Sequence, residues 1–320
     1  MPSINSTTSV QSLTLLSEQL TIILGFVILI SGFFGNLMNI ILLLNLGSVN
    51  NNPCSFYIFV KSFFDFVTLF VGVGTRILNQ GFHIDLTLSS RLWCKFRIPF
   101  LDMTTLCSFS CLCFQSIDTF FSSSRSVSWR RKSNIKVARC LLLGFMCVWI
   151  LMNIPYFFFQ ELVLNAPTRI YRCVTINGNY ALFRSYFIVV GLYFIIPIII
   201  VGVFGFLTCR QLQRLTVQQR RSLSALNKQM ARMVLFQIIV VLIFIAPHAL
   251  VTIYSIGTAG MIKTAYRLAV ENVIQVVFNM YGYGALSVRK LLLRRTIIDQ
   301  ALFLLLDFVL LLLHSIPTIS

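Results

Sequence analysis

Long apolar segments alternate with short polar segments along most of this chain of 320 residues. Seven of the apolar segments reach or exceed the ~20 residues that an α-helix needs to cross the hydrocarbon core of a bilayer. They span residues 20–46, 55–78, 96–121, 137–159, 182–207, 230–256 and 265–286. Backbone polar groups in lipid must pair within their own segment, so we predict seven transmembrane helices.

The segments outside this region complete the predicted organisation. Residues 1–19 contain no lysine or arginine and form an N-terminal tail, in which Asn5 begins an Asn-Ser-Thr acceptor for N-glycosylation. After the bundle of residues 20–286, basic side chains flank a leucine run in residues 287–300, typical of an amphipathic membrane-surface helix. Residues 301–320 form an apolar tail whose apolar part is too short for a span. We therefore predict an all-α membrane protein, a seven-transmembrane helix bundle with a short amphipathic helix after the seventh span.

The composition excludes a water-soluble domain. Hydrophobic residues make up 57% of the chain and charged residues only 11%, and a soluble domain of this length could not bury so much apolar surface. In a soluble protein the net charge of +17 would suggest nucleic acid. In a membrane protein it indicates basic loops that face anionic lipid, so we predict the lipid bilayer as a partner and no nucleic acid.

The loop charges favour an outside N-terminus. With this orientation the inner segments carry 16 lysine and arginine residues and the outer segments carry 9, as the positive-inside rule requires. We therefore predict a multi-pass protein of the plasma membrane with an extracellular N-terminus. The same orientation places Cys94 and Cys173 on the oxidising side, where they either form a disulfide or remain two unpaired loop cysteines.

Ionisable side chains inside predicted spans are candidate functional groups, because an unpaired charge in lipid costs several kcal/mol. Asp65 lies in the second span, and Lys61 lies four residues earlier on the same helix face. Lys61 either pairs with Asp65 or extends to the inner membrane surface.

The outer half of the predicted bundle holds the candidate ligand-binding residues Arg76, Arg97, Asp102, His248 and Tyr254. Asp102 either binds a cationic ligand or pairs with Arg76 or Arg97, and we favour the internal pair. His248 either contacts the ligand or forms a neutral hydrogen bond within the bundle.

The order and spacing of these features resemble those of rhodopsin-like (class A) G-protein-coupled receptors over about residues 20–295. The matching positions are Gly35-Asn36, Asp65, Cys94, Cys173, Asp118, Trp149, Pro197, Pro247, Asn279 and Tyr283. The resemblance implies a disulfide between the two cysteines and an extracellular small-molecule or peptide ligand in the outer half of the bundle. It also implies a heterotrimeric G protein at the cytoplasmic face.

The resemblance implies further roles by position. It assigns a sodium-binding polar pocket to Asn36, Asp65, Ser108, Gln275 and Asn279. An internal Lys61–Asp65 pair would replace that ion, and we predict no other cofactor. The position at which amine receptors of the family carry an aspartate falls on Leu101, which joins the ligand-binding candidates. The family's switch elements fall on Asp118, Thr119, Pro247 and Tyr283.

The chain also departs from the family pattern. The Asp-Arg-Tyr triplet reads Asp118-Thr119-Phe120, so its arginine is absent and Thr119 cannot form an ionic lock. Ile245 replaces a tryptophan of the sixth span, and Met280 replaces a proline of the seventh. Such losses are similar to those in divergent invertebrate orphan and chemoreceptor-type expansions.

The predicted function is that of a G-protein-coupled receptor. The alternative is a non-signalling seven-span protein, a decayed or decoy copy. A transporter is less favoured, since we find no internal repeat. A membrane enzyme would need clustered histidine, glutamate or serine–histidine groups at membrane depth, and the pattern shows none, so we predict no catalytic activity and no metal.

Overall fold

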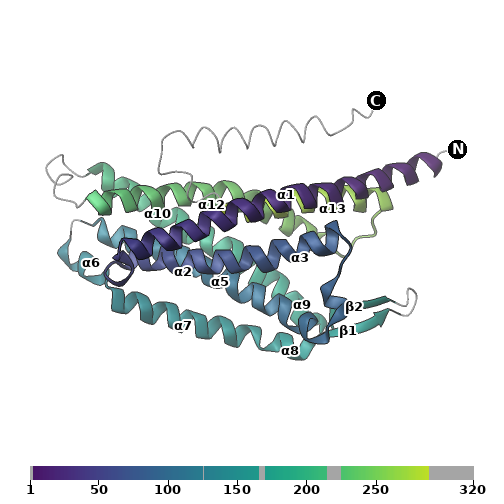
Figure 1. The fold of residues 1–320 in the computed structure, drawn as a ribbon, viewed down its shortest axis with the longest axis horizontal. Helices are drawn as coiled ribbons and strands as arrows, with labels where there is room; N and C mark the ends of the chain where they lie inside the picture. Colours follow the sequence, from purple (N-terminus) through teal and green to yellow (C-terminus); the bar gives the residue numbers. More distant parts are fainter. Residues whose placement is uncertain (1–2, 125, 166–169, 215–224, 288–320) are drawn as a thin grey trace.

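The computed structural model describes residues 3–124, 126–165, 170–214 and 225–287. Its long helices lie side by side in an elongated bundle, and the N-terminus lies at the same end as the β-hairpin (Figure 1). Five helical segments of the described chain are long and apolar enough to cross a membrane: Thr8–Asn45, Pro53–Gly81, Arg91–Ser122, Ile135–Phe159 and Gly178–Gln211.

Two further long helices complete the bundle. They are α12 (Ala225–Gly257), whose Leu242–Gly257 part is strongly apolar, and α13 (Ala265–Ser287). Together with the five segments above, they account for all seven predicted spans. The predicted amphipathic helix beyond Ser287 and the apolar C-terminal tail lie outside the described residues.

Several spans consist of consecutive helical pieces. The pieces before the hairpin are α1 (Ser3–Asn45), η1 (Ser48–Asn50), α2 (Pro53–Thr68), η2 (Leu69–Val73), α3 (Gly74–Arg76), η3 (Ile77–Gly81), α4 (Leu86–Ser89), α5 (Arg91–Ser122), α6 (Val127–Lys132), α7 (Ile135–Asn153) and α8 (Pro155–Phe159). Those after it are α9 (Gly178–Phe183), η4 (Arg184–Ile195) and α10 (Ile196–Arg214). The segments η2, η3 and η4 are π-helical, and each continues the span of its neighbours without a break.

Local sequence signals explain several helix starts. Helix α2 begins at Pro53, which needs no amide donor there, and the side chain of Asn52 accepts a hydrogen bond from the Cys54 amide. Ser90 caps α5 in the same way, and Asn134 caps α7. These caps place the helix starts within a few residues of the predicted span boundaries.

Helix α1 is longer than predicted. It begins at Ser3, whereas residues 1–19 were expected to form a tail before the first span. The hydroxyls of Ser12, Thr14 and Ser17 donate to backbone carbonyls one turn earlier, so these polar residues are compatible with a helix. The polar composition of residues 3–19 therefore marks where the apolar stretch begins, whereas the helix itself begins earlier.

A β-hairpin follows α8 and was not predicted. Strand β1 (Gln160–Asn165) pairs antiparallel with β2 (Ile170–Thr175), and Leu162 lies opposite Cys173. Two six-residue strands in a polar loop give little periodic signal, so the sequence alone did not reveal them.

Helix α5 is the central element of the bundle. It packs against α2, α7 and α10, and most of its side chains from Thr104 to Thr119 are buried. Trp149 of α7 donates a hydrogen bond to Ser110 of α5 at 3.0 Å. Many large apolar side chains of the outer helices, such as Leu151 and Leu250, are exposed, as expected of surfaces that face lipid.

Candidate functional site

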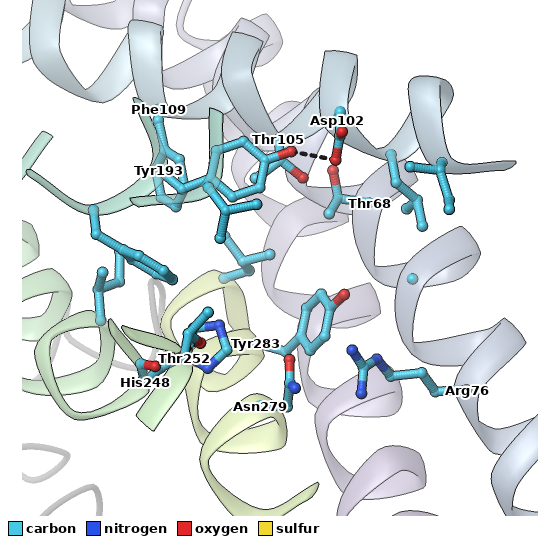
Figure 2. A pocket seen from close by; sticks show the side chains of 18 of the residues that line it. Thr68, Arg76, Asp102, Thr105, Phe109, Tyr193, His248, Thr252, Asn279 and Tyr283 are labelled. Carbon is cyan, nitrogen blue, oxygen red and sulfur yellow. Dashed lines mark hydrogen bonds between the residues drawn. The ribbon is translucent and has the colours of Figure 1, made fainter. Parts of the chain in front are cut away.

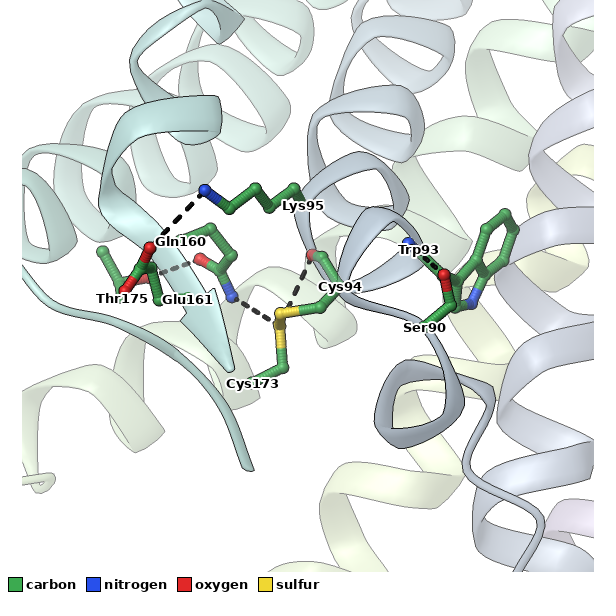
Figure 3. Close-up of a disulfide and its surroundings, with 8 residues drawn as sticks. All are labelled: Ser90, Trp93, Cys94, Lys95, Gln160, Glu161, Cys173 and Thr175. Carbon is green, nitrogen blue, oxygen red and sulfur yellow. Dashed lines mark hydrogen bonds and ion pairs between the residues drawn. A yellow bond between two sulfur atoms is a disulfide. The ribbon is translucent and has the colours of Figure 1, made fainter. Parts of the chain in front are cut away.

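A disulfide ties the hairpin to the start of α5. Cys94 and Cys173 are bonded with a Cα–Cα distance of 5.7 Å, which confirms the predicted pairing (Figure 3). Gln160 holds the other strand against the bridge, donating to Cys173 Sγ at 3.3 Å and accepting from the Thr175 hydroxyl at 2.8 Å. We refer to this part of the bundle as the disulfide end.

An ion pair adds a second connection at the same place. Glu161 of β1 lies 2.9 Å from the guanidinium of Arg91, in the first turn of α5. It also lies 3.6 Å from the ammonium of Lys95, in the next turn (Figure 3). The hydrogen bond from Arg91 holds the pKa of the Glu161 carboxyl below its ordinary value. The hairpin is therefore fixed to α5 by one covalent bond and one charged contact.

A cavity of about 390 Å³ lies among α2, η2, α3, α5, η4, α12 and α13 (Figure 2). Its charged or titratable lining residues are Arg76, Arg97, Asp102, Arg184 and His248. Its aromatic lining residues are Phe109, Tyr193, Phe194 and Tyr283. The structure thus brings Arg76, Arg97, Leu101, Asp102 and His248, five of the six predicted ligand-binding residues, into one cavity.

Asp102 is paired, but not with the predicted partners. Arg184 of η4 donates two hydrogen bonds to its carboxylate, at 3.1 and 3.2 Å, and the Tyr193 hydroxyl donates a third at 2.6 Å. The favoured pairing with Arg76 or Arg97 is therefore wrong. Arg184 was missed because, although it falls at the start of the predicted fifth span, no sequence pattern relates it to Asp102, 82 residues earlier. The helical segments α9 and η4 bring it into the bundle.

Arg76 lies across the cavity from Asp102 (Figure 2). Its guanidinium carbon is 5.9 Å from the ring centre of Tyr283. A β-carbon at Gly72 would come within 2.9 Å of the Tyr283 hydroxyl, so the absence of a side chain at Gly72 makes room for this ring.

His248 lies in the cavity wall one residue after Pro247. Its ring packs edge-on against Phe194, with centroids 5.2 Å apart. Gly282 of α13 lies against the other side of the imidazole, and a β-carbon there would be 3.0 Å from His248 Cγ. The imidazole ring therefore contacts both η4 and α13, so a shift of the ring at one contact alters the packing at the other.

Tyr254 is not part of this cavity. It donates a hydrogen bond to Glu271 at 3.1 Å, and Glu271 also binds Arg267 and Lys263. Tyr254, Glu271 and Arg267 line a separate hollow between α12 and α13. The prediction that Tyr254 joins the main ligand-binding set is corrected accordingly, because Tyr254 lies six residues after His248 and therefore about 120° away around the helix.

Lys61 and Asp65 form a buried pair. The Lys61 ammonium lies 3.1 Å from Asp65 Oδ1 and 2.5 Å from the Ser108 hydroxyl, and Ser108 also donates to Asp65. Both charged side chains are almost completely closed to solvent. Lys61 therefore does not extend to the membrane surface, and its ammonium occupies the side of Asp65 that faces Ser108.

The other members of the predicted sodium pocket lie elsewhere. Gln275 donates to Ser255, Asn279 lines the main cavity, and Asn36 donates to the carbonyls of Gly32 and Leu286. The residues around Asp65 thus do not fit a sodium ion. A cation, the ammonium of Lys61, already lies beside Asp65, and the amide nitrogens of Asn36 and Gln275 donate to partners other than Asp65.

Contacts with α1 fix the position of α13 along the bundle. The Leu286 carbonyl accepts a hydrogen bond from Asn36, in the last third of α1, and a β-carbon at Gly35 would lie 3.0 Å from the Ser287 carbonyl. Asn279 and Tyr283 consequently line the cavity near the disulfide end. The structure thus places Tyr283, one of the predicted switch residues, in the same cavity as the ligand-binding candidates. Helix packing sets this depth of α13.

The opposite end of α5, here called the Asp118 end, carries the predicted switch residues Asp118 and Thr119. The Asp118 carboxylate accepts a hydrogen bond from the Ser133 hydroxyl at 2.6 Å, and Thr119 donates to the Gln115 carbonyl of its own helix. Among the described residues no ion pair involves Asp118. Pro247 lies inside α12, as predicted. The side chain of the glycosylation candidate Asn5 is outside the described residues.

Comparison with known proteins identifies the class to which this fold and site belong. The model of the 7-transmembrane receptor (rhodopsin) family matches residues 35–285. The chain belongs to this family of receptors and is a multi-pass membrane protein. A search of curated proteins finds no match.

Proposed function

We propose that this protein binds an extracellular ligand in the cavity at the disulfide end and passes a conformational change to a heterotrimeric G protein at the Asp118 end. The observation that carries the proposal is the cavity itself. Asp102 of α5, Tyr193 of η4, His248 of α12 and Tyr283 of α13 all reach it (Figure 2). A ligand there contacts several helices at once and favours the helix arrangement that it fits best.

The disulfide supports the proposed orientation. Structural disulfides persist in oxidising environments, so we assign the end that carries Cys94 and Cys173 to the extracellular side of the plasma membrane. The N-terminus of α1 lies at that same end, which makes it extracellular (Figure 1). The basic α6, with Arg130, Arg131 and Lys132, then faces the cytoplasm, in line with the positive-inside rule.

Helix α12 is the proposed moving element. Pro247 lacks an amide donor, so a backbone hydrogen bond is missing within the helix and its two halves bend more easily. His248, the next residue, lines the cavity. We propose that ligand contact with His248 changes the bend at Pro247 and moves the half of α12 that lies toward the Asp118 end.

The resting state needs no ionic lock in this proposal. Ser133, at the end of α6, holds the Asp118 carboxylate by a neutral donor. A single hydrogen bond of this kind stabilises by only about 1–2 kcal/mol. Breaking a buried ion pair by removing one partner costs more, about 3–5 kcal/mol. We therefore expect measurable basal coupling.

Guanine-nucleotide exchange tests the proposal. The full-length protein in lipid nanodiscs is mixed with representatives of each Gα class and βγ, and the exchange rate is measured without added ligand. The variant R130Q/R131Q/K132Q should reduce exchange, whereas the matched exposed variant Arg172→Gln on the hairpin should not. Exchange equal to that of empty nanodiscs with every Gα class would contradict coupling and support a non-signalling protein.

A further inference from the structure

The cavity carries more positive than negative charge. Its described lining includes three arginines, Arg76, Arg97 and Arg184, but only one carboxylate, that of Asp102. Arg184 already neutralises this carboxylate with its two hydrogen bonds. The charges of Arg76 and Arg97 therefore have no counterpart in the described cavity wall.

Neither of these two arginines forms an ion pair within the described part of the chain, where no carboxylate oxygen lies within 4.0 Å of either guanidinium. The Nε of Arg97 is buried and has no hydrogen-bond partner there. Arg97 is close enough to Arg76 to be repelled by it, and the acid that attracts Arg97 is Asp85, in the loop before α4. Two like charges in a low-dielectric site, one of which carries a buried Nε donor without a partner, favour an anion beside them.

The cavity wall becomes apolar with depth. Arg97 lies within one turn of Cys94, whereas Phe109 lies about three turns further along α5. Phe194 and Ile245 are buried near Phe109 and line the same deeper part. The cavity therefore offers a basic entrance and an apolar floor.

We infer that the ligand is a small organic anion, with an acidic group such as a carboxylate held by Arg76 and Arg97 and an apolar body directed toward Phe109. The two guanidinium forks provide the paired donors that a carboxylate accepts best. A volume of about 390 Å³ suits a small molecule. The inference rests on the proposed receptor function for its biological meaning, whereas binding itself does not require coupling.

The first experiment measures binding without coupling. Purified full-length protein in nanodiscs is screened by thermal shift against matched triplets, each a carboxylate, its amide and the corresponding amine on one apolar body, such as naphthylbutyrate, naphthylbutyramide and naphthylbutylamine. The carboxylates should give most of the stabilising hits. Sulfonate and phosphate analogues of each carboxylate hit show which acidic group the site prefers.

Arginine variants locate the site of these hits. Arg76→Gln and Arg97→Gln should each weaken carboxylate binding about tenfold or more, because each removes a charge-assisted contact. Arg172→Gln, which removes an exposed arginine on the hairpin, should leave binding unchanged. Arg97→Lys keeps the charge and should bind more tightly than Arg97→Gln, which separates loss of charge from damage to the fold.

Some outcomes would overturn the inference. They are a panel in which carboxylates give no more hits than amides or amines, and carboxylate binding that survives both glutamine variants. G-protein exchange that responds only to amines would overturn the inference and leave the proposed function intact. Carboxylate binding without any exchange would support the inference and contradict the proposed function.

A second experiment needs no ligand. Leu101 lines the cavity four residues after Arg97, so Leu101→Glu places a carboxylate one turn from the guanidinium. If the arginines lack a counter-charge, L101E melts at or above the temperature of the matched variant L101Q, and carboxylate binding is lost. If the arginines already have a counter-charge, the new carboxylate is buried without a partner and L101E melts below L101Q. That result would overturn the inference.

Discussion

The ammonium of Lys61 lies 3.1 Å from the carboxylate of Asp65, one turn further along α2, and both side chains are closed to solvent. A charge inside a bilayer is costly unless it is paired. Lys61 therefore neutralises the Asp65 charge from within the same helix, as a bound cation would otherwise do. Ser108 connects it to α5, the central helix.

Removal of one member of this pair should destabilise the protein. Lys61→Met leaves the Asp65 carboxylate buried without its cation, and we expect a loss of about 3–5 kcal/mol and a lower melting temperature. The double variant K61M/D65N removes both charges and should recover most of the loss. A K61M melting temperature equal to that of the unsubstituted protein would show that the pair contributes nothing.

Sodium should have no effect on the unsubstituted protein. Because Lys61 already supplies the positive charge beside Asp65, replacement of sodium by N-methylglucamine at constant ionic strength should leave its melting temperature unchanged. K61M vacates that position and should become more stable in sodium than in N-methylglucamine. A sodium-dependent melting temperature in the unsubstituted protein would contradict this account.

The disulfide should contribute substantially to stability. A bridge between residues 79 apart lowers the entropy of the unfolded chain, which raises the free energy of unfolding by about 4 kcal/mol. Cys94→Ser, Cys173→Ser and the double variant should therefore lower the melting temperature by similar amounts. Cys140→Ser, at an exposed free cysteine, is the matched control and should not. Additive losses in the double variant would show that each cysteine acts separately.

The contact between Asp102 and Arg184 should stabilise the cavity wall. Arg184→Gln leaves a buried carboxylate with Tyr193 as its remaining described partner, and we expect a loss of about 3 kcal/mol. Tyr193→Phe removes one hydrogen bond and should cost less, about 1–2 kcal/mol. Thermal melting of the two variants measures both losses. A greater loss in Y193F than in R184Q would assign the main role to the tyrosine.

The attachment of the hairpin should depend on pH. Arg91 lowers the pKa of Glu161 in the folded protein, so this contact stabilises above the ordinary glutamate pKa of about 4.5 and is lost as pH falls through the lower folded value. The difference in melting temperature between the unsubstituted protein and Glu161→Gln should therefore be present at pH 7 and shrink below about 4.5. A difference that stays constant across this range would exclude the carboxylate charge as its cause.

Part of the site was predictable because it depends on local pattern. Arg76, Arg97, Asp102 and His248 were recognisable as charged or titratable groups in the outer parts of apolar spans, and the structure places all four in one cavity. Their hydrogen-bond partners were not predictable. The residue that pairs with Asp102 depends on the axial position of η4 within the bundle. The same limit applied to Tyr254, for which a rotation of the helix decides which face it occupies.

The sequence by itself determined that this is a membrane bundle of seven spans, because the length of each apolar segment follows from bilayer thickness. It also placed Cys94 and Cys173 at one end of the bundle, and the resemblance to the receptor family implied the disulfide that the structure shows. Only the tertiary structure decided the depth of α13 and the pairing of Asp102 with Arg184. Apolar periodicity states which face of a helix is buried, but the axial position of that helix is set by packing contacts such as Gly35 against Ser287, between residues far apart in the chain.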